Sequence, residues 1–301
     1  MAEDRRVRGM GWIPDYPDFR DYTEKTSEVK EILNPTGLPL TKEAATNRPR
    51  KTTLPPAADL REFCSAVEDQ KMLGSCTAHA GVGVIEYYER KAFGKHIDAS
   101  RLFLYKVTRN LMKMKGDTGA YLRLTMGAMI LFGVPPEEYW PYTDDEGSFD
   151  REPPAFCYAF AQNYKTLKYY RHDPPGTKPE TVLERLRTHL AAWHPALFGF
   201  TVYNSVEQAS ETGKIPFPSA KEKIEGGHAI VAVGYDDRMK IKNKFESTET
   251  VGAFLIRNSW GKSWGEKGYG WLPYEYLKRG LAEDFWSILK KEWLDTGLFK
   301  A

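Results

Sequence analysis

Three polar side chains, widely separated in the sequence, are suited to nucleophilic catalysis. Cys76 follows Gly74-Ser75 at the predicted start of a helix, where the partial positive charge of the helix N-terminus favours a thiolate. His228 opens an apolar segment that is predicted to be a buried strand, and Asn258 ends another. Each residue alone is more often a buried structural side chain. Brought together by the fold, they would form a nucleophile, a general base and a group that orients the base.

The segments around these residues resemble the papain-like cysteine peptidases, especially their bacterial branch. The matching motifs are Gln70 before Gly-Ser-Cys76, Gly-His228-Ala, and Asn258-Ser-Trp260-Gly, in the family's order. His228 and Asn258 follow Cys76 by 152 and 182 residues, close to the family's spacing. The resemblance runs from about residue 59 to about 277 and implies hydrolysis of peptide bonds through a thioester. It also implies that Gln70 is an oxyanion donor and that Trp260 covers the Cys-His pair.

The same resemblance implies a set of residues that bind substrate and line the pocket for the residue two before the scissile bond. They are Gly74, Ser75, Gly119, Ala120, Tyr121, Leu122, Ala229 and Trp260. Many relatives carry a disulfide between the positions of Leu73 and Asp117, and both cysteines are absent here. The loss of both partners is coherent with a reducing compartment.

Two other functions share parts of this pattern. A catalytically altered binding module is opposed by the presence of all four polar groups. A thiol acyltransferase would pass the thioester to an amine, but such enzymes more often use Asp where this chain has Asn258. A cysteine peptidase, acting on a peptide or protein substrate, is therefore the function that the motifs favour.

The elements that must position these residues are predicted to be helices first and strands later. Such an order indicates an α+β fold with two lobes and a cleft between them, a helical lobe at about 57–145 and a β-rich lobe at about 146–301. Helices are predicted at about 76–93, 101–112 and 121–132 and from about 179, and strands at 196–203, 228–235, 251–258 and 268–272. The charged run 236–250 is predicted to be a solvated hairpin loop.

Residues 1–56 precede the family match and lack the long helix of typical zymogen prosegments. Their stretch Gly11-Trp-Ile-Pro-Asp-Tyr-Pro17 combines aromatic residues with prolines and favours an extended chain that could fill a peptide-binding cleft. We therefore hypothesise that part of this segment covers the Cys76–His228 cleft. The alternative is a structural strap on the back of a lobe.

Composition narrows the remaining possibilities. The 301 residues include 43 basic and 41 acidic side chains, a balance that does not indicate a nucleic-acid or membrane partner. No secretory signal is visible, so a cytoplasmic protein is expected. Cys64, Cys76 and Cys157 are too few for a disulfide framework and too widely spaced for structural zinc, although a Cys64–Cys157 bond stays open. We expect no cofactor or metal, and no catalytic role for four histidines without a partner motif, namely His96, His172, His189 and His194. The sequence leaves the oligomeric state open.

Overall fold

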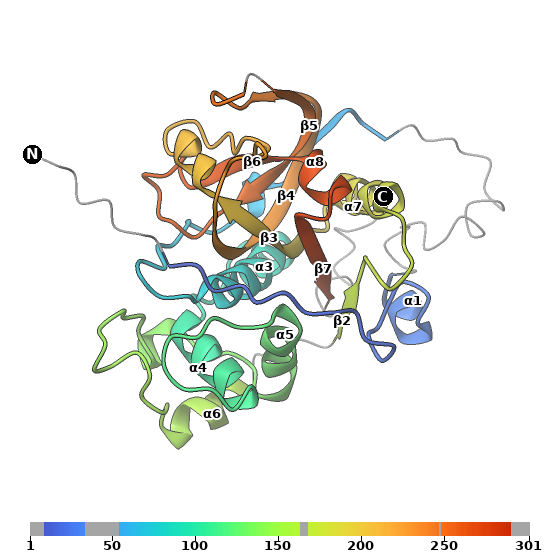
Figure 1. Cartoon of the computed structure of the whole chain (residues 1–301). Coiled ribbons are helices and arrows are strands. Elements are labelled where there is room, and N and C mark those ends of the chain that lie inside the picture. Colours follow the sequence, from blue (N-terminus) through green and yellow to red (C-terminus); the bar gives the residue numbers. More distant parts are fainter. Residues whose placement is uncertain (1–8, 34–53, 163–167, 247, 290–301) are drawn as a thin grey trace, which may run out of the picture.

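The computed structural model describes residues 9–33, 54–162, 168–246 and 248–289. It has the predicted two-lobed α+β arrangement, with helices on one side and an antiparallel sheet on the other (Figure 1). The helical lobe contains α3 (Cys76–Phe93), α4 (Arg101–Leu111), α5 (Leu122–Leu131) and α6 (Ala155–Ala161). Three further helices are α1 (Ser27–Leu33), α7 (Pro179–Ala191) and α8 (Tyr274–Lys278).

The sheet runs in the order β2, β7, β3, β4, β5, β6, and β1 pairs with β4. The strands are β1 (Ala57–Asp59), β2 (Lys168–Arg171), β3 (Ala196–Tyr203), β4 (Ile224–Lys242), β5 (Glu249–Arg257), β6 (Tyr269–Pro273) and β7 (Ala282–Leu289). Val231 of β4 lies opposite Arg257 of β5. This register brings the residue that follows β5, Asn258, towards the beginning of the buried part of β4, where His228 lies.

The helix boundaries follow local signals in the sequence. Ser100 caps α4, because its Oγ accepts a hydrogen bond of 3.1 Å from the N–H of Phe103. Gly94 ends α3 in the left-handed conformation, with φ of 71°. Ser75 precedes α3 without capping it, and its hydroxyl instead lies 2.7 Å from the hydroxyl of Tyr142. The start of α3 at Cys76 is therefore fixed by the preceding turn and by tertiary contacts.

Some sequence predictions need correction. The charged run 236–250 is mostly paired strand, because β4 continues to Lys242 and β5 begins at Glu249. Buried Ile241 favours this pairing. Helix α6 was not predicted, and its Tyr158 packs edge-on against Phe103 of α4, so the helical side extends beyond residue 145. All three cysteines are free, which excludes the Cys64–Cys157 disulfide.

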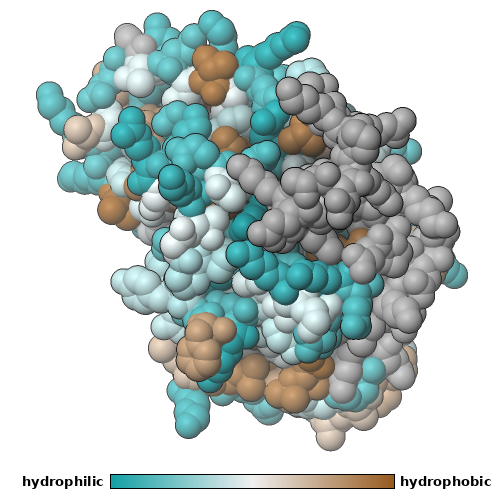
Figure 2. Space-filling view, turned by 90° about the vertical axis from the view of Figure 1, so that its right-hand side faces the viewer, coloured by the Kyte–Doolittle hydropathy of each residue, from teal (hydrophilic) through white to brown (hydrophobic). Residues whose placement is uncertain are grey.

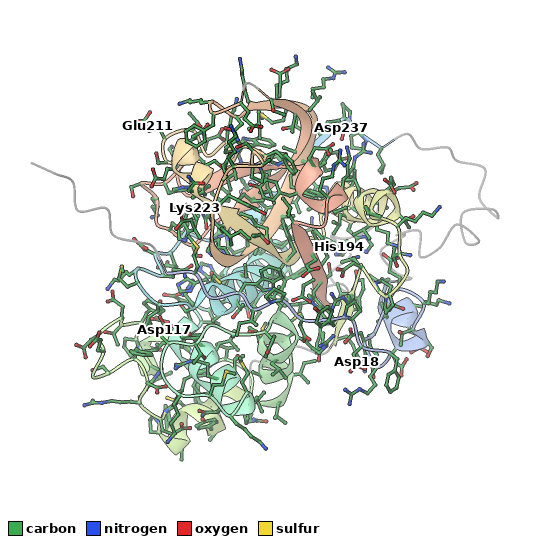
Figure 3. All side chains as sticks on the ribbon, viewed as in Figure 1. Asp18, Asp117, His194, Glu211, Lys223 and Asp237 are labelled. Carbon is green, nitrogen blue, oxygen red and sulfur yellow. The ribbon has the colours of Figure 1, made fainter. Side chains whose placement is uncertain are left out.

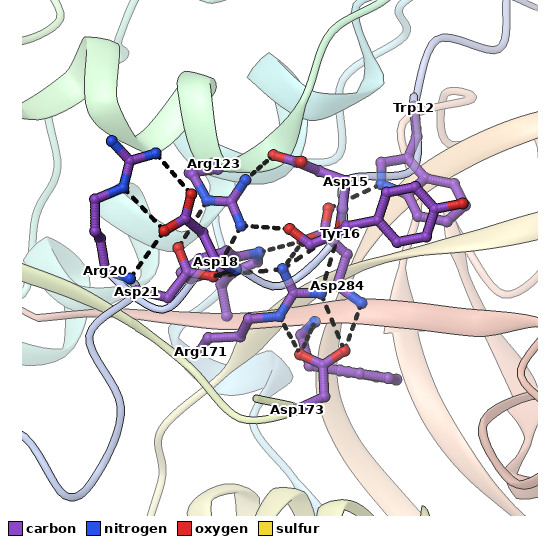
Figure 4. Close-up of polar contacts among 12 residues, drawn as sticks. Trp12, Asp15, Tyr16, Asp18, Arg20, Asp21, Arg123, Arg171, Asp173 and Asp284 are labelled. Carbon is purple, nitrogen blue, oxygen red and sulfur yellow. Dashed lines mark hydrogen bonds and ion pairs between the residues drawn. The ribbon is translucent and has the colours of Figure 1, made fainter. Parts of the chain in front are cut away.

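An N-terminal segment, residues 9–23, crosses the molecule between the two lobes (Figure 1). Its acidic side chains meet buried or half-buried arginines of the body (Figure 4). Arg123 of α5 binds Asp21 with Nε–Oδ1 at 2.7 Å and also pairs with Asp15, while buried Arg171 of β2 donates to the carbonyl of Asp15. The segment is thus fixed to both lobes.

The described part of the face drawn in Figure 2 has the polarity of an ordinary globular surface. On the face in Figure 2, hydrophobic residues lie singly or in small groups among hydrophilic ones, as on ordinary globular surfaces. Among the described helices, none has the length and apolar character needed to cross a membrane.

Candidate active site

The first predicted catalytic residue, Cys76, is the first residue of α3 and is fully buried. Its Sγ accepts a hydrogen bond of 3.3 Å from the backbone N–H of Ala229, the residue after His228. This contact joins the helical lobe to β4. Burial raises the pKa of the Cys76 thiol to about 11, although N–H groups of Ala229, Gly11 and Thr77 oppose the rise. The expected thiolate is therefore not the favoured form here, because the covered site excludes solvent.

His228 and Asn258 lie together as the strand register requires. His228 Nε2 is 2.8 Å from Asn258 Oδ1, an acceptor that also receives the N–H of Ser259 at 2.8 Å. Because an amide oxygen can only accept, His228 carries its hydrogen on Nε2, and Nδ1 is the atom that can take up a proton. Trp260 stacks on the His228 ring with centroids 4.5 Å apart, and Trp264 meets Trp260 edge-on.

Gln70 is held by Ser259, the residue after Asn258. Its backbone N–H donates to Ser259 O at 2.8 Å, and its side-chain Oε1 accepts from the Ser259 hydroxyl. Its Nε2 donates to Leu73 O at 2.7 Å and to Gly9 O at 2.9 Å. The amide that was predicted to bind an oxyanion is thus occupied by a carbonyl of the N-terminal segment.

Several of the predicted substrate-binding residues contact the N-terminal segment. Ala120 donates its N–H to Gly11 O at 2.7 Å and accepts from Ile13 N at 3.1 Å, which makes Trp12 and Ala120 parallel partners. Gly74 and Gly119 approach Gly11 so closely that a Cβ on Gly119 would lie 2.4 Å from Gly11 O. The remaining predicted residues are Leu122, buried at the start of α5, Tyr121 just before it, Ala229 and Trp260 beside the catalytic pair, and Ser75, whose side chain contacts Tyr142.

Three residues of the site were not predicted. Gly227 accepts the N–H of Trp12 at 3.0 Å, and Ser259 fixes Gln70. Asp117, labelled on the helical side in Figure 3, accepts hydrogen bonds from Gly74 N at 2.9 Å and from the hydroxyl of Tyr105 at 2.6 Å. Asp117 thus ties two loops together at the position where relatives carry a disulfide. Only the departure from that disulfide pattern could have pointed to it.

Comparisons with known proteins identify relatives of this chain. The model of the papain family cysteine proteases matches residues 54–285. An uncharacterized peptidase C1-like protein of Acanthamoeba polyphaga mimivirus is 35% identical over 228 residues, which cover 73% of this chain and 68% of that protein. Chicken cathepsin K is 26% identical over 219 residues, 71% of this chain and 58% of the cathepsin.

Solved structures give the same result. Xylellain, a cysteine protease from Xylella fastidiosa, is 34% identical and superposes with a TM-score of 0.72, covering 93% of this chain and 96% of xylellain. The matched region includes Cys76, His228 and Asn258 with their contacts. The chain therefore belongs to the papain family of cysteine proteases, a family of cysteine-type peptidases.

Proposed function

We propose that this protein hydrolyses peptide bonds with Cys76 as nucleophile, His228 as general base and acid, Asn258 as orienter and Gln70 as oxyanion donor. The observation that carries the proposal is the convergence of Cys76, Ala229 and the His228–Asn258 pair across the lobe boundary. Among the described residues, neither of the other two cysteines, Cys64 and Cys157, is paired with an oriented imidazole at a helix N-terminus.

The chemistry follows from these positions. His228 Nδ1 takes the thiol proton, and the Cys76 sulfur attacks the peptide carbonyl to form a C–S bond. The carbonyl oxygen becomes an oxyanion, which the Gln70 amide and the Cys76 N–H stabilise. As the C–N bond breaks, His228 returns the proton to the leaving amine, and water, deprotonated by the same ring, then hydrolyses the thioester. Asn258 keeps the ring oriented through both steps.

The test is hydrolysis of a fluorogenic peptide by the full chain and by Cys76→Ala and Cys64→Ala variants. We expect Cys76→Ala to abolish hydrolysis and Cys64→Ala, which changes a thiol outside the site, to retain it. Activity that survives in Cys76→Ala would refute the assignment. Product release that depends on an added amine would instead support a thiol acyltransferase, and an intact site without turnover would support a binding module.

We further propose that the N-terminal segment restrains this activity. Gly9 O occupies the Gln70 amide, and Gly11 and Ile13 pair with Ala120. A substrate whose scissile carbonyl meets Gln70, and whose preceding residues meet Ala120, would run from Ala120 towards Gln70. The segment runs the opposite way, so it fills the cleft without presenting a bond in the orientation required for attack.

A shortened chain that begins at Pro55 tests this restraint. It should hydrolyse a small peptide faster than the full chain, and a synthetic peptide of residues 9–23 should slow it again. Circular dichroism establishes that both chains are folded. Equal rates for two folded chains would leave the segment as a structural strap.

A further inference from the structure

A second cluster of chemically competent side chains lies away from Cys76, at the far end of the N-terminal segment. It consists of Glu24, which precedes α1, His172, which follows β2, and His189 of α7. All three are buried, with 5%, 0% and 1% of their surface exposed. Glu24 Oε1 lies 3.6 Å from His172 Nδ1 and 3.4 Å from His189 Nε2, and all three atoms lie within 4.8 Å of one another.

These three atoms lack hydrogen-bond partners among the described residues. The other nitrogen of each histidine ring makes a hydrogen bond that shows which nitrogen carries the hydrogen. His189 Nδ1 lies 2.8 Å from Arg185 O, and a carbonyl only accepts, so Nδ1 carries the hydrogen. His172 Nε2 lies 2.8 Å from Ser287 Oγ, whose own hydrogen is donated to Pro195 O at 3.1 Å. His172 therefore donates from Nε2 and, like His189, directs a lone pair at Glu24.

The burial of the cluster reinforces this conclusion. Glu24, His172 and His189 are all buried, and the three facing atoms receive no hydrogen bond from the described residues. Two imidazole nitrogens and a carboxylate oxygen that face one another in the protein interior are electrostatically unfavourable unless a cation joins them.

We propose that Glu24, His172 and His189 bind one Zn²⁺ ion. Two imidazole nitrogens and a carboxylate oxygen form a donor set that zinc binds at about 2.0–2.2 Å, which places neighbouring ligand atoms of a tetrahedron about 3.3 Å apart. The separations of 3.4 and 3.6 Å from Glu24 Oε1 need only a small contraction, and the two ring nitrogens, which lie within 4.8 Å of each other, would approach at the same time. The outer contacts to Arg185 O and Ser287 Oγ orient both rings as metal-binding histidines require.

The remaining neighbours fit the same role. Arg185 approaches the other carboxylate oxygen, Oε2, at 3.4 Å, which leaves Oε1 available to the ion. His194, labelled in Figure 3, has its ring 6.5 Å from that of His189 and is not part of the donor set. Because Glu24 belongs to the N-terminal part of the chain and both histidines to the body, the ion would fasten one to the other. Zinc should therefore stabilise the attachment of residues 9–33.

The test uses the full chain with Cys76→Ala, so that the thiol near His228 cannot bind the metal. After treatment with EDTA and removal of the chelator, ZnCl₂ is titrated by calorimetry and the melting temperature is recorded. We expect one equivalent of zinc and a higher melting temperature. CoCl₂ should give the visible absorption bands of a four-coordinate site with nitrogen and oxygen ligands.

Glu24→Gln keeps the shape of the side chain and supplies an N–H donor to the two lone pairs. It should raise the dissociation constant for zinc at least tenfold. His96→Asn, at a histidine outside the cluster, should bind zinc as the parent does. Absence of binding by the folded protein, or undiminished binding by Glu24→Gln, would overturn the proposal.

Discussion

Replacing Trp12 with Ala should release the N-terminal segment and activate the enzyme. Trp12 is 4% exposed, its ring packs directly on Gly199 and Gly227, and its Nε1 donates to Asp284 Oδ2 at 3.2 Å. Truncating a buried Trp costs about 3–5 kcal/mol. Because each 1.4 kcal/mol is a factor of ten, the ratio of closed to open cleft should fall by about a hundred- to a few thousand-fold.

The assay compares kcat/KM for a small fluorogenic peptide in the full chain, Trp12→Ala and Phe19→Ala. Phe19 lies on the same segment but is 94% exposed, so its removal should leave kcat/KM unchanged. The gain in Trp12→Ala is limited to the point at which every molecule is open, and limited proteolysis after residue 9 should rise in parallel. A folded Trp12→Ala protein with the activity of the parent would refute the reasoning that Trp12 holds the segment in the cleft.

The remaining predictions concern the thiol, the oxyanion donor and the loop contact. When the N-terminal segment covers the cleft, the pKa of Cys76 is about 11, above that of an ordinary thiol. The free energy that favours the covered cleft is therefore constant below about pH 8.5 and decreases by roughly 3 kcal/mol as the pH rises towards 11. Alkylation of the full chain should therefore accelerate only at high pH and that of Trp12→Ala at lower pH; identical profiles would contradict this. Gln70→Ala should lower kcat by about 10²–10³-fold with little change in KM in steady-state kinetics, and an unchanged kcat would remove Gln70 from the mechanism. Asp117→Ala should cost about 1–3 kcal/mol in urea unfolding, because Gly74 N and the Tyr105 hydroxyl lose their acceptor, whereas Asp144→Ala, in an exposed pair with Lys71, should cost less than 1 kcal/mol.

The sequence was sufficient for the parts of the fold that local signals determine. The predicted bounds of α3, α4 and β3 agree closely with the structure, because Gly94 and the capping residue Ser100 mark helix ends locally and a run of apolar residues marks β3. The charged run after Tyr235 was misjudged, since cross-strand pairing with β5 outweighs its polarity. Such pairing depends on a partner that no local pattern reveals.

The candidate site shows the same division. Cys76, His228, Asn258 and Gln70 have distinctive neighbours in the sequence, so all four could be proposed as site residues from the sequence alone. The raised pKa of Cys76 was not predicted, because it depends on burial beneath a segment some 65 residues away in sequence. Glu24, His172 and His189 share no motif either, and only the packing of α7 against the N-terminal part of the chain brings them together.

The link made by Asp117 bears on how the protein is produced. Its hydrogen bonds to Gly74 and Tyr105 form as the chain folds and require no oxidant, and all three cysteines are free thiols. Refolding should therefore proceed as well in a strongly reducing buffer as in air, without a disulfide isomerase. Reductants added to keep the nucleophile active leave this connection intact, so the same conditions serve biosynthesis, purification and assay.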